Sequence, residues 1–407
     1  MLALLGGDPV RTSPVPVWPI HGEQERSLLL RVLDSGIWSY DGPMEAEFSA
    51  KFAEFCHASY AFCVPNGTQS LELALRALEV GPGDEVILPA LTWTAPAWAV
   101  VQAGAIPVFI DIREEDWCLD PDRIGAALTP ATRAIIPVHM FSQVAEMDQI
   151  LEIAAKGSLH VLEDCAHSHG SQWNGRCVGT LGDIGSFSCQ QGKLITAGEG
   201  GIVITNREDL ADRLYGLKNC GRPWRSTSEI GFSGNYRITE FQAAILLAQL
   251  DRLAEQLHIK ETNVAAFRRQ IAAVPGVYPL ARKEKVTKQN MFGLSIRIDP
   301  DKFAGVSPSV LVDALMAEGV AARPSNEVLY KSSLWRSGVT ARRWHKNADA
   351  HRMLGLNAYC PVAERVEAEG FILSHETFLG NLRDVEDVVT AFEKVQRHAH
   401  ELSAIML

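Results

Sequence analysis

Between residues 60 and 220 the chain alternates short apolar runs with amphipathic segments, and this alternation constrains the fold more than any other feature of the sequence. Strands separated by helical patterns are typical of βαβ units, which place parallel strands in one sheet with helices on its faces. The expected strands are 60–64, 84–88, 106–110, 134–138, 160–163, 185–188 and 201–205, and the expected helices are 23–35, 44–56, 69–78, 95–103, 147–155, 208–220 and 239–274. We therefore expect an α/β fold with a mostly parallel mixed sheet.

The length of 407 residues favours two domains. Four prolines between residues 9 and 19 predict an extended arm over residues 1–22, because proline removes a backbone donor and disfavours helix before it. We expect a large domain over residues 23–260 and a smaller C-terminal α/β domain over residues 261–407. The expected elements of the smaller domain are strands 291–298 and 371–373 and helices 309–317 and 382–402.

The net charge of −11 argues against a nucleic acid or an anionic membrane as a partner, because both attract clustered lysine and arginine. The one locally basic stretch, residues 342–346, is interpreted as solvated surface. No apolar run reaches the length of about 18 residues that a membrane span needs. Eight cysteines without CxxC spacing predict no metal site, and they favour reduced thiols and a cytoplasmic location.

The first segment with chemical content is 163–168, with the sequence EDCAHS at the end of an apolar strand. Parallel sheets present ligand-binding groups at the C-terminal ends of their strands. The carboxylate of Asp164 could hold a pyridine nitrogen protonated there, which makes such a ring an electron sink. Taken alone, an aspartate at a strand end is more often part of a turn or a helix cap than a ligand-binding group.

The second segment, 185–201, has the sequence GSFSCQQGKLITAGEGG and places Lys193 just after a strand. A lysine that forms a Schiff base must be deprotonated, so it needs a confined and partly desolvated loop. The glycines allow the backbone to turn sharply around a bulky ring. A surface lysine is the alternative for a lone residue of this kind, but Asp164 precedes Lys193 by only 29 residues, which favours a shared site.

Two further positions fit a site for a phosphorylated aromatic ligand. Residues 66–71, NGTQSL, lie at a strand–helix junction, where backbone N–H groups favour an anion. The alternative is a helix cap without a ligand. Trp93 follows another strand and could stack on a cofactor ring, although a tryptophan in the core fits the pattern as well.

In this order, these segments resemble the DegT/DnrJ/EryC1/StrS aminotransferases, also called sugar aminotransferases. Residues 234–244, GNYRITEFQAA, are similar to the GYNYR segment of that family, and the resemblance runs from about Gly6 to the C-terminus. Residues 5–11 and 360–364 resemble the branch that contains inosose aminotransferases and 3-amino-5-hydroxybenzoate synthases. Residues 139–142 read HMFS where the family often has HLYG, and residues 325–330 lack the Gly-Tyr-Pro pattern of the branch. Both departures from the family pattern concern the identity of the substrate and not that of the cofactor.

The resemblance implies the fold of aspartate aminotransferase, which is PLP-dependent transferase fold type I, with pyridoxal 5′-phosphate (PLP) as cofactor. It implies that Lys193 forms the Schiff base with PLP and acts as general acid and base. Asp164 would pair with the pyridine nitrogen, and His167 would lie against the ring.

The remaining cofactor contacts also follow from the resemblance. Trp93 would stack on the ring, and Gly67, Thr68 and Ser188 would bind the phosphate. Asn235 would reach the phosphate of the neighbouring subunit, which implies a homodimer with shared active sites.

The activity that the resemblance implies moves an amino group from L-glutamine or L-glutamate to a cyclic ketone, either a ketocyclitol of the inosose type or an aminoglycoside-type keto-sugar. One alternative is a PLP-dependent dehydratase of the 3-amino-5-hydroxybenzoate synthase type. Another is an aminotransferase of a nucleotide-linked ketosugar, for which Arg222, Arg225, Arg323 and Lys331 are candidate diphosphate ligands. A non-catalytic sensor is the third alternative. The sequence leaves open whether Arg237 or Arg222 holds the carboxylate of the amino donor.

Overall fold

The computed structural model describes residues 1–225, 231–337, 355 and 358–403. The basic stretch at 342–346 lies outside the described residues. Two hydrophobic cores organise the chain, a larger one that begins at Val32 and a smaller one built mainly from residues after 263. In the described part of the chain, no helix is both long enough and apolar enough to cross a membrane.

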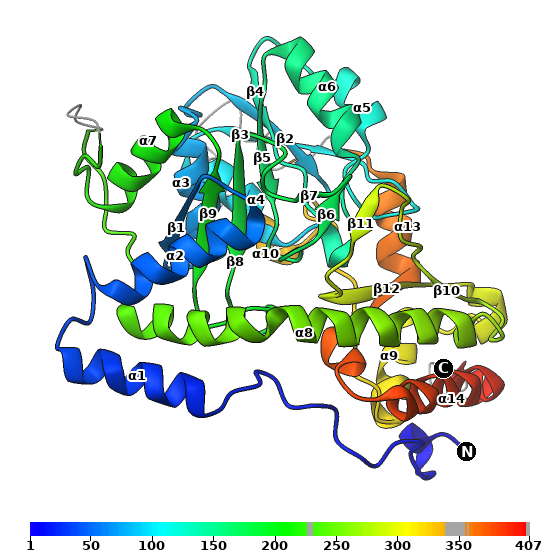
Figure 1. Cartoon of the computed structure of the whole chain (residues 1–407). Coiled ribbons are helices and arrows are strands. Elements are labelled where there is room, and N and C mark those ends of the chain that lie inside the picture. The colour runs from blue at the N-terminus through cyan, green and yellow to red at the C-terminus, as the bar shows by residue number, and fades with distance from the viewer. Residues whose placement is uncertain (226–230, 338–354, 356–357, 404–407) are drawn as a thin grey trace.

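A seven-stranded sheet forms the centre of the large domain (Figure 1). Its strands are β1 (Tyr60–Val64), β2 (Glu85–Pro89), β3 (Ile106–Ile110), β4 (Thr132–Ile135), β5 (His160–Asp164), β8 (Ile184–Ser188) and β9 (Gly201–Thr205). They follow the order β1-β9-β8-β5-β4-β2-β3, and β9 alone runs antiparallel to its two neighbours. The mostly parallel mixed sheet expected from the sequence is confirmed.

Helices connect these strands and cover the sheet, as expected for βαβ units. They are α2 (Pro43–Cys56), α3 (Gly67–Ala77), α4 (Thr94–Gln102), α5 (Pro121–Ala127), α6 (Met147–Gly157) and α7 (Glu208–Lys218). The sequence analysis missed α5, which has only 7 residues. Its start nevertheless carries local signals, because the Asp120 side chain caps the helix and Pro121 occupies its first turn.

Helix α8 (Glu240–Ile271) links the two cores by running from the large sheet to the smaller domain (Figure 1). Thr239 and Gln242 form a capping box that fixes its first turn. Leu257 still packs in the large core, whereas Val264 belongs to the smaller one. Helix α1 (Glu23–Ser35) lies along α8.

The smaller domain is built on a four-stranded antiparallel sheet of order β10-β12-β14-β13. Its strands are β10 (Val277–Pro279), β12 (Gly293–Ile298), β13 (Ala322–Pro324) and β14 (Gly370–Ser374), and its helices are α9 (Pro308–Ala317), α14 (Leu382–Arg397) and α15 (Ala399–Ser403). Two further helices in this part of the chain, α10 (Ser333–Arg336) and α13 (Pro361–Glu369), pack their buried residues into the larger core. Helix α14 buries one apolar face that includes Val385, Val388 and Phe392. A third sheet pairs β11 (Val286–Lys288) with β6 (Gln172–Trp173), which in turn pairs with β7 (Arg176–Cys177).

The N-terminal arm packs across the smaller domain and reaches the loop that carries Lys193. The Leu2 side chain is fully buried in the smaller core, and the backbone N–H groups of Ala3 and Val10 donate to Glu318. Farther along, the Trp18 indole N–H donates to the carbonyl of Gln191 at 3.0 Å. The arm therefore ties the start of the chain to both the smaller domain and the loop after β8.

Candidate active site

A cavity of about 950 Å³ opens where the C-terminal ends of the parallel strands meet. The residues predicted from the sequence that line it are Gly67, Thr68, Trp93, Asp164, His167, Ser188 and Lys193. They follow β1, β2, β5 and β8, so the topology of the sheet brings them together. Asn235 does not line this cavity and is exposed on the same chain.

Lys193 presents its amine to this cavity from the loop after β8. Its Nζ lies 4.7 Å from the centroid of the Phe292 ring, and among the described residues it forms no hydrogen bond or ion pair. Burial lowers the pKa of Lys193 to about 8, an effect that Asp164 opposes and the Arg323 charge reinforces. A substantial fraction of the amine is therefore neutral near physiological pH and available as a nucleophile.

Asp164, the last residue of β5, is buried at the floor of the same cavity. The backbone N–H of Ala166 donates to one carboxylate oxygen at 3.0 Å, and the charge on Lys193 acts on this carboxylate. Burial nevertheless raises the pKa of Asp164 above its ordinary value. A cationic group of a ligand placed beside Asp164 would oppose this effect and favour the charged carboxylate.

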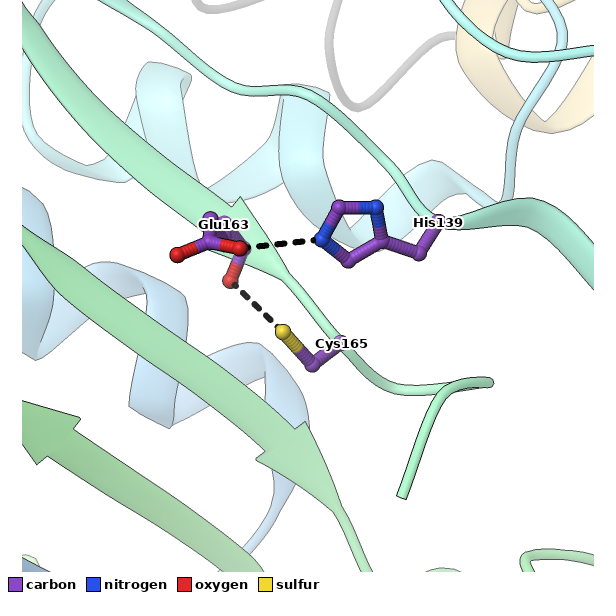
Figure 2. A group of neighbouring side chains, drawn as sticks. All are labelled: His139, Glu163 and Cys165. Atoms are coloured by element: carbon purple, nitrogen blue, oxygen red, sulfur yellow. Dashed lines mark hydrogen bonds and ion pairs between the residues drawn. The ribbon is translucent and has the colours of Figure 1, made fainter. Parts of the chain in front are cut away.

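Behind Asp164, three buried side chains form the group drawn in Figure 2: His139, Glu163 and Cys165. The Glu163 carboxylate accepts from His139 Nε2 at 3.1 Å and from the backbone N–H groups of Gly179, Leu181 and Gly182. The other ring nitrogen of His139, Nδ1, accepts from the Ala145 N–H, so Nε2 carries the proton. The side-chain atoms of Glu163 and His139 are thus occupied by hydrogen bonds within the protein. We interpret Glu163 and His139 as a structural brace that holds the end of β5, not as metal ligands.

His167 lies in a set of three nearly parallel rings beside the cavity. Its ring centroid is 4.3 Å from that of Phe292 and 5.0 Å from that of Phe141. The Phe141 N–H donates to its Nδ1 at 3.4 Å. Burial lowers the pKa of His167 well below the ordinary range, so the ring is neutral and can pack against a flat aromatic ligand.

The HMFS segment shapes this wall of the cavity through an unusual backbone. Phe141 and Ser142 have φ values of 43° and 72°, in the left-handed region that favours glycine. The Ser142 hydroxyl accepts from the N–H groups of Phe292 at 2.5 Å and Gly293 at 3.3 Å. Ser142 therefore adopts a backbone conformation that glycine usually occupies, and its hydroxyl links this turn to the start of β12.

The turn before α3 has the form expected of an anion site. Asn66 caps the helix by accepting from the Gln69 N–H at 2.9 Å. A Cβ atom at Gly67 would approach the Ser188 Cβ to 2.7 Å, so only glycine lets the turn pack against β8. The first N–H groups of a helix lack partners within the helix, and here they lie at the cavity beside the Thr68 and Ser188 side chains.

Of the candidate cations for a diphosphate, only Arg323 lines this cavity. Arg222 lies over the Tyr40 ring, Arg225 over Trp224, and Lys331 pairs with Glu364. The sequence analysis missed several other lining residues that come from the smaller domain, namely Phe292, Asn326, His375 and Glu376. No local motif marks them, because the packing of the two domains brings them to the site.

Comparisons with known proteins agree with this geometry. A model of the DegT/DnrJ/EryC1/StrS aminotransferase family matches residues 19–392. A candidate L-glutamine:3-amino-2,3-dideoxy-scyllo-inosose aminotransferase from Streptoalloteichus tenebrarius is 39% identical, and the alignment covers 98% of this chain and 99% of that protein. The L-glutamine:2-deoxy-scyllo-inosose aminotransferase of the same organism is 37% identical, with 99% of each chain covered. The crystal structure of 3-amino-5-hydroxybenzoic acid synthase matches with a TM-score of 0.83 and 30% identity, covering 95% of this chain and 99% of that one.

Proposed function

The chain belongs to the DegT/DnrJ/EryC1/StrS aminotransferase family, and from that premise we propose that it moves the amino group of L-glutamine onto a cyclic ketone of the scyllo-inosose class. The observation that carries the proposal is that Lys193 and Asp164 line one cavity, after neighbouring parallel strands. Relatives that match nearly the whole chain are named for L-glutamine and for scyllo-inosose ketones. The free cysteines support a cytoplasmic location.

The proposed cofactor is PLP, and the described residues fit it. The cavity holds an amine without a partner at Lys193, a buried carboxylate at Asp164, and a helix N-terminus packed against Ser188. Gly67, Thr68 and Ser188 would hold the phosphate, and Trp93 and His167 would flank the ring. When bound, PLP supplies an aldehyde that condenses with amines and a ring that takes up electrons from the donor α-carbon.

Lys193 is the proposed general acid and base. Its amine takes the proton from the α-carbon of the amino donor and delivers it to the C4′ carbon of the cofactor. In the second half of the reaction, it moves a proton in the reverse direction to form the amine on the ketone carbon. Such a base works best with a pKa near the operating pH, and the lowered pKa of about 8 meets this condition.

Asp164 is proposed to hold the proton on the pyridine nitrogen throughout. The brace of Glu163 and His139 fixes the end of β5, so the carboxylate does not need to reorganise during the reaction. A fixed charge of this kind stabilises the transition state more than the ground state.

A homodimer with shared active sites is part of the proposal. Asn235 is exposed and does not line the cavity of its own chain, which fits a contact with the cofactor phosphate of a partner subunit. Leu30, Leu33 and Trp38, on α1 and the loop after it, are each about half exposed. Exposed apolar side chains gathered on one helix and the loop after it fit a protein–protein interface.

The direct test is Lys193→Ala, assayed with L-glutamine and 2-deoxy-scyllo-inosose. We expect the variant to lose both the absorbance band of the lysine-bound cofactor and turnover. An alanine at exposed Lys156, whose ion pair within the described residues is with Glu152 one turn away, serves as the control and should leave both intact. Turnover retained by Lys193→Ala would refute the assignment.

The solved synthase favours one second candidate, a dehydratase that forms an aromatic amine. Both reactions could use the same lysine, and the products distinguish them. An aminated cyclitol that keeps its hydroxyl groups supports the aminotransferase, whereas an aromatic product that absorbs in the ultraviolet supports the synthase.

A further inference from the structure

Arg323 occupies an unusual position for an arginine. It lies in β13, at the edge of the smaller sheet, and its side chain lines the cavity. The guanidinium carbon is 4.8 Å from the centroid of the Phe141 ring and 6.0 Å from that of Phe292. Among the described residues it forms no hydrogen bond or ion pair. A half-buried guanidinium with five unused donors is costly unless a ligand supplies the acceptors.

Among the described residues, the charged side chains around Arg323 do not accept hydrogen bonds from its guanidinium. Glu376 is the carboxylate that acts on it, but no ion pair joins the two side chains in the described part of the chain. The Arg323 charge also acts on Lys193, His167 and His375, which places it close to the reacting centre. The cavity therefore combines the free amine of Lys193 with a second, unpaired cation.

The chemistry of the two substrates decides which of them Arg323 fits. A guanidinium presents two parallel N–H groups that match a carboxylate. A scyllo-inosose ketone is an uncharged polyol, whereas the amino donor carries a carboxylate on the α-carbon that Lys193 must reach. Lys193 and Arg323 both lie beside the Phe292 ring, line the same cavity and interact through their charges, so Arg323 is the cation placed beside the reacting α-carbon.

We propose that Arg323 binds the α-carboxylate of the amino donor, which is L-glutamine under the proposed function on which this inference rests. Arg222 and Arg237, the alternatives from the sequence, lie 5.3 Å and 5.1 Å from the centroid of the Tyr40 ring and do not line the cavity of their own chain. The Arg323 guanidinium lies over the Phe141 ring and near Phe292, and its N–H groups have no acceptor among the described residues, so they are free for a ligand.

The test uses two probes that lack an α-amino group and so cannot be transaminated. Glutaramate keeps the carboxylate and amide of L-glutamine, and glutaramide replaces the carboxylate with a second amide. Binding of each probe to the holoenzyme is measured by calorimetry for the wild type, Arg323→Lys and Arg323→Gln. Arg383→Gln, at an exposed position on α14, is the matched control.

We expect Arg323→Gln to weaken glutaramate binding by about tenfold to a hundredfold, the usual range for losing a charged hydrogen-bond partner, and to leave glutaramide binding unchanged. Arg323→Lys should recover part of the loss, and Arg383→Gln should match the wild type. The KM for L-glutamine should rise in parallel, while amination of the ketone by enzyme already loaded with pyridoxamine phosphate should persist.

Three outcomes overturn the inference: equal affinity of the wild type for both probes, glutaramate binding by Arg323→Gln within twofold of the wild type, or an equal loss for both probes. The last result would mean that the substitution altered the shape of the cavity. If the wild type fails to transfer nitrogen from L-glutamine to any cyclic ketone, the proposed function fails instead, and the two failures are therefore distinguishable.

Discussion

At the scale of single residues, the surroundings of Lys193 determine how much of its amine is protonated. An ordinary lysine is almost fully protonated at neutral pH, and burial beside Arg323 reverses part of that preference. The neighbouring carboxylate of Asp164 works in the opposite direction and keeps the pKa from falling further. Asp164 and Arg323 therefore shift the pKa of Lys193 in opposite directions.

This balance predicts the pH dependence of cofactor capture by the apo-protein. Only the neutral amine attacks the aldehyde, so the rate of PLP binding should rise with pH up to about 8 and then level off. Arg323→Gln removes a charge that lowers the pKa of Lys193, so its midpoint should move to higher pH. Stopped-flow absorbance measures both curves, and the ionisations of free PLP cancel in the comparison. A wild-type rate that still climbs tenfold between pH 9 and 10 would contradict the lowered pKa.

At the scale of elements, neighbouring strands explain why the sequence predicted part of the site. Asp164 and Lys193 follow β5 and β8, which are adjacent and parallel, so their order along the chain is enough to bring them together. Arg323 lies in a three-residue strand that ends in Pro324, which gives no strand signal. The sequence therefore identified Arg323 only as one of several cations, and the pairing of β13 with β14 places it at the cavity.

The backbone of the HMFS segment shows a second limit of sequence reasoning. From the sequence, the missing glycine of this segment is connected with the identity of the substrate. In the structure Ser142 keeps a left-handed backbone, and its hydroxyl anchors two N–H groups at the start of β12. Such compensation depends on a contact about 150 residues away in the chain, which no local pattern reveals.

The brace behind Asp164 yields a prediction for Glu163→Gln. The carboxylate accepts four hydrogen bonds, two on each oxygen, and an amide nitrogen in either place would face two donors. We expect a loss of about 2–5 kcal/mol in the free energy of unfolding, because buried donors lose their acceptor. Urea denaturation measures the change. Glu152→Gln, at an exposed pair with Lys156, should change the stability by less than about 0.5 kcal/mol. A loss from Glu163→Gln as small as that of this control would mean that the brace is not needed.

At the scale of the whole molecule, each chain supplies most of its own active site and, through Asn235, a candidate residue for the active site of a partner subunit. The cavity of each chain contains Lys193 and Asp164, whereas Asn235 lies outside it on an exposed segment. The loop at Tyr40 lies beside this segment, because Arg237 packs over the Tyr40 ring. The half-exposed Trp38 belongs to the same surface. The proposed two-fold dimer forms through this surface, and under that proposal Asn235 of each subunit lies near the cavity of the other.

Shared sites predict complementation between two defective chains. Lys193→Ala lacks the essential amine, and Asn235→Ala should bind PLP more weakly because it lacks the proposed contact with the partner's phosphate. A mixed dimer, purified through a different affinity tag on each chain, contains one site with both residues intact, since its Lys193 comes from one chain and its Asn235 from the other. Its activity at limiting PLP should be about half that of the wild type, one of two equivalent sites. If Asn235 instead served its own chain, both sites of the mixed dimer would be defective, and its activity would not exceed that of the Asn235→Ala homodimer.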